Sequence, residues 1–423
     1  MKKFSEREAA VFALKEITEV GAYSNEALRR FLGTQGHFER VQKAFVTEIV
    51  AGCVRNLLLI DHIIGNFSKT PVKKLKPMVL GILRVSVYQL KFMDKVPTFA
   101  VCNEAVEMTK KHGLSGLSGF VNGVLRNIAR AEIAEPEDLS IRYSVQPWIV
   151  EHFVGELGES AAVQVLESMM KPPVISICVN TLKTTVDELI EILVSEGVMV
   201  QRGNLEGSLM VSKTSDIAAL QSFKDGLYHV MDEGAMLAVH AAAPPANARI
   251  IDLCAAPGGK AFLAAYMAGA GAEILACDVH AHKIKLLEQG AARLGLANVK
   301  TALHDARIFR PELEETADLV IADVPCSGLG TLRKRPDLKL NKQPESMETL
   351  AGLAREIIKN SWRYVKIGGR LLFSTCTISN VENMDNFEWI KANLPFKAVE
   401  SKMILPSDFD SDGFFIAVLE RVE

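Results

Sequence analysis

Two cysteines follow apolar stretches of the sequence, at points where strands are expected to end. ADLVIADVPCSGLG, residues 317–330, is an apolar run that stops at Asp323 and continues into Cys326. LLFSTCT, residues 371–377, places Cys376 in the same way. A cysteine within a core is usually inert, whereas a thiol at a strand end with polar neighbours is a candidate reactive group. Both thiols are therefore predicted to be functional.

Acidic residues also follow the expected strands. The first strand runs into DLCAAPGGK, residues 252–260, where paired glycines allow backbone N–H groups to approach a ligand closely. Asp278, Asp305 and Asp323 stand at the ends of later strands, where carboxylates bind ribose hydroxyls. One such acid is usually a helix cap, but three on one sheet favour a nucleoside pocket. Since the glycine turn matches neither a Walker motif nor G-x-G-x-x-G, S-adenosylmethionine, which has no phosphates, is favoured over NAD.

An enzyme that transfers a methyl group needs a thiol when the atom to be methylated is a carbon that is a poor nucleophile. Carbon 5 of a pyrimidine is such an atom. A thiolate that adds to carbon 6 makes carbon 5 able to attack the methyl group. The charge that develops on the ring needs an acid near N3, and Asp323 suits this role if it is protonated or hydrogen-bonded. The site is also expected to lower the pKa of the attacking thiol. The Asp-x-Pro-Cys pattern alone favours Cys326 as that thiol, with Cys376 as its rival.

These groups must be positioned by a sheet of parallel strands. From about residue 236 the sequence alternates apolar strands with helices, which predicts right-handed βαβ units and a doubly wound sheet. The carboxyl ends of neighbouring strands meet at one edge of such a sheet, so the ligand and both thiols are expected in one cleft. A last strand, FFIAVLER, is expected to be an antiparallel edge strand. The parallel strands are expected at ARIIDLC, EILACD, VKTALHD, DLVIAD and GRLLFST.

Two further regions precede this sheet. Residues 1–135 contain apolar positions that recur near every 3.6 residues, which predicts an all-α domain. An acidic stretch at residues 131–140 is typical of a linker. Residues 141–235 combine helices with the short strand patterns PPVISICVNTL, VMVQRG and SLMVSK, which predict a small α+β domain. The predicted domains are therefore 1–135, 141–235 and 236–423.

The composition is that of a folded protein in a reducing compartment. Of the 423 residues, 48 % are apolar and 23 % are charged, so disorder is not expected. No uncharged apolar run reaches the roughly 18 residues that span a membrane, and MKKFSEREAA is unlike a signal peptide. The seven cysteines are scattered and never spaced C-x-x-C, which argues against disulfides and zinc. We expect a cytoplasmic protein without a metal, in which Cys53, Cys102 and Cys178 are packing residues.

Basic residues gather in the front of the chain and in one loop. Residues 1–135 hold 20 Lys and Arg against 13 Asp and Glu, while the rest of the chain is acidic. A basic front suggests an anionic partner such as nucleic acid, but charge alone fits a solvated helical surface equally well. The loop at residues 327–343 carries Arg333, Lys334 and Arg335, which suit phosphate contacts. The target base must leave any helical stack to reach the pocket.

Four sequence blocks resemble the signature motifs of the NOL1/NOP2/Sun family of RNA 5-methylcytosine methyltransferases. They are DLCAAPGGK, DVPCSGLGTLRKRPD, FSTCTISNVEN and SDGFFIA, in this order. The front of the chain, with AVCNEAVEMTKKHGLSGLSGFVNGVLRNIAR at residues 100–130, resembles the NusB-type RNA-binding fold. The combination is similar to the bacterial family members that act on 16S ribosomal RNA. It implies a NusB-like all-α domain, a small α+β domain and an α/β Rossmann-like methyltransferase domain with a seven-stranded sheet.

The resemblance assigns roles to individual residues. In the family the nucleophile is the cysteine of the Ser-Thr-Cys block, here Cys376, while Cys326 assists release of the methylated RNA and Asp323 touches cofactor and base. Lys260 is expected at both the cofactor and the RNA. Cys178, Met231, Ala261 and Asn380 depart from the family pattern, but none of them replaces a catalytic group. The residues implied in S-adenosylmethionine binding are Cys254, Ala255, Ala256, Pro257, Gly258, Gly259, Lys260, Asp278, Asp305 and Asp323.

The leading prediction is an S-adenosylmethionine-dependent enzyme that methylates carbon 5 of one cytosine in 16S rRNA. The protein is expected to be a monomer that meets its RNA free or in an early small-subunit particle. One alternative is a methyltransferase of the same chemistry acting on tRNA or another RNA. Another is an RNA-binding assembly factor with an inactive methyltransferase body, which the intact Asp323, Cys326 and Cys376 disfavour.

Overall fold

The computed structural model describes residues 4–212 and 216–423. The first three residues of the charged amino terminus and the last residue of the SLMVSK strand pattern lie outside the described residues. By internal packing the chain forms two units, which we call the helical unit and the sheet unit. The helical unit comprises Met1–Ala162 and Lys334–Lys342, and the sheet unit comprises Val163–Arg333 and Gln343–Glu423.

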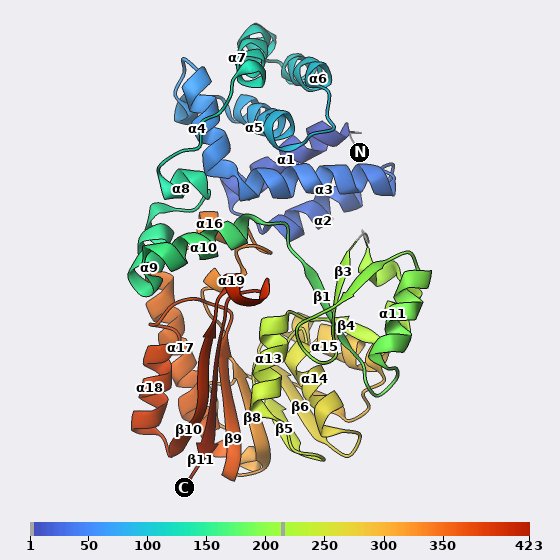
Figure 1. Ribbon diagram of the computed structural model, residues 1–423, viewed down its shortest axis with the longest axis vertical. Coiled ribbons are helices and arrows are strands. Elements are labelled where there is room, and N and C mark those ends of the chain that lie inside the picture. Colours follow the sequence, from blue (N-terminus) through green and yellow to red (C-terminus); the bar gives the residue numbers. More distant parts are fainter. Residues whose placement is uncertain (1–3, 213–215) are drawn as a thin grey trace. The chain divides into compact units, whose positions relative to one another are not determined.

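The helical unit confirms the predicted all-α fold (Figure 1). The first helix begins at a capping box between Ser5 and Glu8 and ends at Gly21, which adopts the left-handed conformation. Its apolar face packs with the third and fifth helices around one core. The helices are α1 (Glu6–Val20), α2 (Ser24–Thr34), α3 (Arg40–Arg55), α4 (Leu57–Phe67), α5 (Pro77–Phe92), α6 (Thr98–Lys111), α7 (Ser118–Arg130), α8 (Leu139–Arg142) and α9 (Pro147–Leu157), with 3-10 turns at Val72–Lys74 and Ser115–Leu117.

A late segment of the chain belongs to the helical unit. Lys334–Lys342, which includes α16 (Leu338–Asn341), packs among helices that precede it by almost two hundred residues or more. Asp337 accepts a hydrogen bond from Ser24 at 2.5 Å. The fully buried Lys339 donates to the carbonyl oxygen of Tyr143 at 3.2 Å. We call these nine residues the α16 segment.

The chain enters the sheet unit along α10 (Glu159–Met170) and first forms a small antiparallel sheet. Its strand order is β2-β3-β1-β4, and helices α11 and α12 accompany it. The three predicted strand patterns appear here, and a three-residue strand that was not predicted completes the sheet. The elements are β1 (Ile175–Val179), α11 (Val186–Ser195), β2 (Met199–Arg202), β3 (Ser208–Ser212), a 3-10 turn (Ile217–Ala219), α12 (Gln221–Lys224) and β4 (Tyr228–Val230).

The rest of the sheet unit is built on a seven-stranded sheet of order β10-β11-β9-β8-β5-β6-β7. The five predicted strands are parallel, as expected. Strand order reverses beside β5, and ligands bind outside the carboxyl ends of strands at such a point. The strands are β5 (Arg249–Asp252), β6 (Glu273–Asp278), β7 (Val299–Leu303), β8 (Ala317–Asp323), β9 (Val365–Thr375), β10 (Phe396–Ile404) and β11 (Phe414–Arg421).

One strand prediction was wrong in part. FFIAVLER forms β11 and is antiparallel to β9, as predicted, but it is not an edge strand. The strand β10 pairs with its other side. Most side chains of β10 are exposed, so its sequence FKAVESKMI lacks the apolar run from which a strand was expected. An edge strand of this kind has little core to mark it in a sequence.

Helices cover both faces of the large sheet, as Figure 1 shows. Neighbouring residues of β5 point to opposite faces, so Ile250 packs with one helical layer and Ile251 with the other. The first layer is α13 (Glu233–Ala242), α14 (Gly259–Ala268) and α15 (Ala281–Leu294). The second is α17 (Glu345–Ser361) and α18 (Met384–Asn393). Short elements complete the unit: α19 (Pro406–Phe409) and 3-10 turns at Pro311–Leu313, Leu329–Thr331 and Trp362–Tyr364.

Candidate active site

The two predicted thiols meet at the carboxyl ends of β8 and β9. These strands are adjacent and parallel, and Asp323 stands opposite Ser374 in their register. The loops that follow carry Cys326 and Cys376 toward each other, and the two Sγ atoms lie 3.4 Å apart. Both cysteines are partly exposed, and all seven cysteines of the chain are free thiols. The structure therefore brings together the two thiols that the sequence left as rivals.

A buried carboxylate fastens the two cysteine loops to each other. Glu382 is only 2 % exposed and accepts hydrogen bonds from the Ser327 backbone N–H at 2.7 Å and from the Ser327 hydroxyl at 2.5 Å. The Ser327 and Thr377 hydroxyls are 2.6 Å apart, which links the residues that directly follow the two cysteines. Sequence reasoning missed Glu382, because its partner lies 55 positions away.

The surroundings keep Cys326 protonated. Its pKa is raised above the usual value, first because its thiol hydrogen-bonds to Cys376, then because surrounding protein atoms desolvate its sulfur, with smaller contributions from the negative charges of Glu382 and Asp323. This direction is opposite to the one expected of an attacking thiol. A protonated Cys326 is a poor nucleophile, and its thiol can donate a hydrogen bond to Cys376.

Asp323 is held by two donors. The Ser374 hydroxyl donates to its Oδ1 at 2.9 Å, and the ammonium of Lys260 lies 2.7 Å from its Oδ2. Lys260 is buried and also lies 4.7 Å from the centre of the Phe414 ring. Removing one partner of a buried ion pair typically costs about 3–5 kcal/mol. The structure holds Asp323 as a hydrogen-bond acceptor, and its role near N3 of the base stays a prediction.

The glycine turn after β5 has the shape of a ligand cradle. Gly258 has a φ of 116° and is the N-cap of α14. A Cβ added to it would lie 2.3 Å from the Phe262 ring, so only glycine fits. Met231, one of the departures from the family pattern, packs against Gly259. The turn leaves the first backbone N–H groups of α14 at the carboxyl edge of the sheet.

Acids line this edge on the side away from the thiols. Asp278 ends β6, and its Oδ1 accepts a hydrogen bond from the backbone N–H of His280 at 2.9 Å. Asp305 follows β7 and is paired with Arg307, whose guanidinium donates to both carboxylate oxygens. Those hydrogen bonds are the main reason why the pKa of Asp305 is lowered to about 2. Val279, an exposed apolar side chain beside Asp278, is a candidate contact that sequence reasoning missed.

The cradle fits a cofactor that carries hydroxyl groups and positive charge. Asp252 ends β5 beneath the turn and is 1 % exposed. Its Oδ2 has no hydrogen-bond partner among the residues that the structure describes. With Asp278 and Asp323 it places carboxyl groups at the ends of three adjacent strands. Ribose hydroxyls, an ammonium and a sulfonium are groups that such carboxylates bind.

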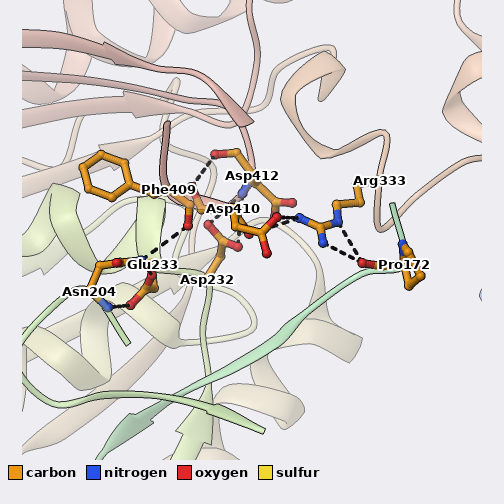
Figure 2. Close-up of polar contacts among 9 residues, drawn as sticks. Pro172, Asn204, Asp232, Glu233, Arg333, Phe409, Asp410 and Asp412 are labelled. Atoms are coloured by element: carbon orange, nitrogen blue, oxygen red, sulfur yellow. Dashed lines mark hydrogen bonds and ion pairs between the residues drawn. The ribbon is translucent and has the colours of Figure 1, made fainter. Parts of the chain in front are cut away.

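The predicted RNA contacts differ in accessibility. Arg333 is 4 % exposed, and Figure 2 shows its guanidinium between Pro172 and Asp410. It donates to the Pro172 carbonyl oxygen at 2.6 and 2.9 Å and to Asp410 Oδ1 at 2.5 Å, so its donors serve the fold. Lys260 is likewise buried. Lys334 and Arg335 are exposed, and Arg335 lies 5.7 Å from the Tyr23 ring within the helical unit.

The SDGFFIA block joins the small sheet to the large one. Asp232 is the N-cap of α13, and Figure 2 shows its carboxylate accepting a hydrogen bond from the backbone N–H of Asp412, at 3.2 Å to Oδ1 and 3.3 Å to Oδ2. In the next residue, Gly413, the N–H donates to the carbonyl oxygen of Gly330 at 2.8 Å. A Cβ on Gly330 would lie 2.0 Å from the Gly413 carbonyl oxygen. The loop that carries Cys326 is thus pinned against the start of β11.

A seven-stranded sheet of this order, with a glycine turn and acids at its carboxyl edge, defines an S-adenosylmethionine-dependent methyltransferase. A family model described as 16S rRNA methyltransferase RsmB/F matches residues 239–420, and one described as NusB family matches residues 5–130. The probable ribosomal RNA small subunit methyltransferase B of Bacillus subtilis (strain 168) is 33 % identical over 448 residues, covering 100 % of both chains. The chain therefore belongs to the RsmB/F family of 16S rRNA methyltransferases, with a NusB-type front.

Two solved structures share the fold of this chain. The chain is similar to the crystal structure of PH0851, with 28 % identity and a TM-score of 0.83, over 99 % of this chain and 100 % of the other. It shares the fold of NSun6 from Pyrococcus horikoshii, at 22 % identity and a TM-score of 0.60, over 66 % of this chain and 98 % of the other. Across residues 4–212 and 216–423, no helix has the length and apolar character needed to cross a membrane.

Proposed function

We propose that the protein methylates carbon 5 of a specific cytosine in 16S rRNA through a covalent bond between Cys376 and carbon 6. The observation that carries the proposal is the pair of thiols 3.4 Å apart at adjacent strand ends. Methylation of nitrogen or oxygen needs no thiol, whereas carbon 5 must first be activated by addition at carbon 6. Asp323, beside the thiols and next to the cofactor turn, stands where both substrates would meet.

The environments of the two thiols support Cys376 as the nucleophile. The raised pKa of Cys326 keeps its proton in place, which disfavours Cys326 as the attacking thiol and leaves it as a hydrogen-bond donor to Cys376. As Cys376 adds to carbon 6, electron density moves toward N3 of the ring. The ammonium of Lys260, which lies 2.7 Å from Asp323 Oδ2, is the hydrogen-bond donor that we propose for that side of the ring. When bound, S-adenosylmethionine supplies the methyl group that carbon 5 takes.

Release needs a base and a leaving thiolate. The proton on carbon 5 passes to a solvent base, its bonding electrons form the carbon 5–carbon 6 double bond, and Cys376 leaves as a thiolate. The Cys326 sulfur lies 3.4 Å from the leaving sulfur and can assist this step by donating its proton to the Cys376 thiolate, after which Cys326 takes a proton from solvent. The Glu382 bridge holds both loops, so the distance between the thiols is set by the fold.

The substrate and setting follow from the family and from the surface. We propose 16S rRNA as the partner, bound by a monomer in the cytoplasm, where the thiols stay reduced. Lys334 and Arg335 are the proposed phosphate contacts of the loop that follows Cys326. The functional division 1–135, 141–235 and 236–423 stays a proposal beside the two packing units.

The test is a comparison of three cysteine variants. Cys376→Ala should abolish methyl transfer and form no adduct, whereas Cys326→Ala should accumulate a covalent RNA–protein adduct on a denaturing gel. Cys102→Ala, in the helical unit, is the matched control and should behave like the unchanged protein. An adduct in Cys376→Ala together with loss of activity only in Cys326→Ala would reverse the two roles. Sequencing the methylated RNA would identify the cytosine and distinguish 16S rRNA from tRNA.

A further inference from the structure

One carboxyl group in the cradle lies where an ionised carboxylate is hard to accommodate. Asp252 is 1 % exposed, and its Oδ2 has no hydrogen-bond partner within residues 4–212 and 216–423. Its Oδ1 accepts a single hydrogen bond, from the backbone N–H of Cys254 at 3.3 Å. A buried charge needs an ion-pair partner or several hydrogen bonds, and Asp252 has neither.

The groups that face Asp252 increase this cost. β5 lies between β8 and β6, so the carboxylates of Asp323 and Asp278 flank it on both sides. From α14, the ammonium of Lys260 pairs with Asp323. From α15, the ammonium of Lys283 lies 3.6 Å from Asp278. If all three carboxyls were ionised, each cation would already be paired with an acid other than Asp252.

Two other cysteines, Cys254 and Cys277, lie next to Asp252, Asp278 and Asp323 and add no positive charge. Burial is the main cause that raises the pKa of Cys254, with the negative charges of the acids adding to it. Burial also raises the pKa of Cys277 on β6 to about 12, and the charge of Asp252 contributes. Both thiols are therefore neutral near pH 7 and act on Asp252 only as buried, uncharged neighbours.

We propose that Asp252 carries a proton in the cofactor-free protein and releases it to solvent when S-adenosylmethionine binds. No bond other than the O–H bond of the carboxylic acid is broken in this step. The cofactor brings a sulfonium and an ammonium against one carboxylate of its own, whereas its product, S-adenosylhomocysteine, has a neutral sulfur. Proton release thus accompanies binding of the cofactor more than binding of the product.

The acidity of the group fits this role. Burial, and then the negative charge of Asp323, raise the pKa of Asp252 to about 7, so the acid and its anion are both populated near neutrality. A positive charge within about 4–6 Å lowers the pKa of a carboxyl group by roughly 1–3. With a sulfonium bound beside it, Asp252 would be held as a carboxylate, and this carboxylate would bind the cofactor more tightly than the product. This coupling concerns the cofactor alone and does not depend on the thiols or on RNA.

The experiment is titration calorimetry of the full chain without RNA. At pH 6.5, S-adenosylmethionine is titrated in two buffers of different ionisation enthalpy, and the difference in binding heat gives the protons released. We expect about 0.5–0.8 proton for S-adenosylmethionine and less than half of that for S-adenosylhomocysteine. Equal heats in the two buffers, or equal release with both ligands, would overturn the proposal. Since the assay contains no RNA, this outcome leaves the proposed cytosine chemistry untouched.

Two variants assign the proton to a residue. Asp252→Asn should bind S-adenosylmethionine about tenfold more weakly, without the proton release. Asp318→Asn is the matched control, because Asp318 is a β8 carboxylate at the other end of the strand, paired with Lys366 at 2.7 Å. It should keep the full release. Release that persists in Asp252→Asn would move the proton to another group. If that variant does not fold, the comparison of the two ligands on the unchanged protein still decides.

Discussion

Replacing Lys339 with methionine should remove a large pH dependence of stability from the helical unit. The side chain is fully buried in the α16 segment and donates to the carbonyl oxygen of Tyr143. Burial, and then the nearby positive charge of Arg55, lower the pKa of Lys339 from 10.5 to about 7. At about 1.4 kcal/mol per pH unit, the difference corresponds to about 5 kcal/mol between the protonated and neutral forms.

The sign follows from proton binding. Between pH 7 and 10.5 the unfolded chain holds a proton on this lysine that the folded chain has largely lost. The free energy of unfolding should therefore rise with pH over this window, and below pH 7 the cost of the buried charge is fully present. Methionine has a similar length and no charge. Between pH 7 and 9.5 the free energy of unfolding of the unchanged protein should rise by about 3 kcal/mol more than that of Lys339→Met.

The assay is urea unfolding at a series of pH values, followed by circular dichroism. Lys359→Met, at an exposed position of α17, serves as the control and should parallel the unchanged protein. A constant difference between Lys339→Met and the unchanged protein from pH 7 to 9.5 would refute the reasoning. Lys339 would then titrate as an exposed lysine does, and burial would not be what governs it.

Two further predictions concern the loop that carries Cys326. Glu382→Gln replaces one of the two carboxylate oxygens that accept hydrogen bonds from Ser327. Methyl transfer in a single turnover should therefore slow at least about tenfold, while calorimetry should show unchanged S-adenosylmethionine affinity. An unchanged rate would contradict the bridging role. Gly330→Ala places a methyl group against the Gly413 carbonyl oxygen, so the midpoint of thermal unfolding, measured by scanning calorimetry, should fall by several degrees. Gly352→Ala is the control, because the Cβ added there meets open space. Equal midpoints for the two variants would contradict the close approach.

Elements with a strong local signal could be predicted from the sequence. The strand of Ala317–Asp323 is apolar throughout and almost fully buried, and its end marked the site. The adjacency of Cys326 and Cys376 followed because parallel strands end at one edge. The roles of the two thiols came from the family resemblance, since strand ends alone do not distinguish a nucleophile from its helper.

Features that depend on distant partners could not be predicted. Arg333 stands in a basic run typical of an exposed loop, yet its partners Pro172 and Asp410 lie 161 and 77 positions away. Asp252 lies within the quoted glycine block, but its burial and missing hydrogen bond depend on two neighbouring strands. β10 has no apolar run because most of its side chains face solvent. In each case the three-dimensional neighbours, and not the residue type, decide the role.

The α16 segment has a consequence for the order in which the protein matures. A ribosome makes the chain from its amino end, so α1 to α9 emerge long before Lys334–Lys342. The helical unit therefore lacks the α16 segment until residue 342 has been synthesised. Until then, the hydrogen bonds from Ser24 to Asp337 and from Lys339 to the Tyr143 carbonyl oxygen cannot form. By that time β5 to β8 and Cys326 have already been synthesised. The helical unit is thus completed only when the chain already contains the glycine turn after β5 and Cys326.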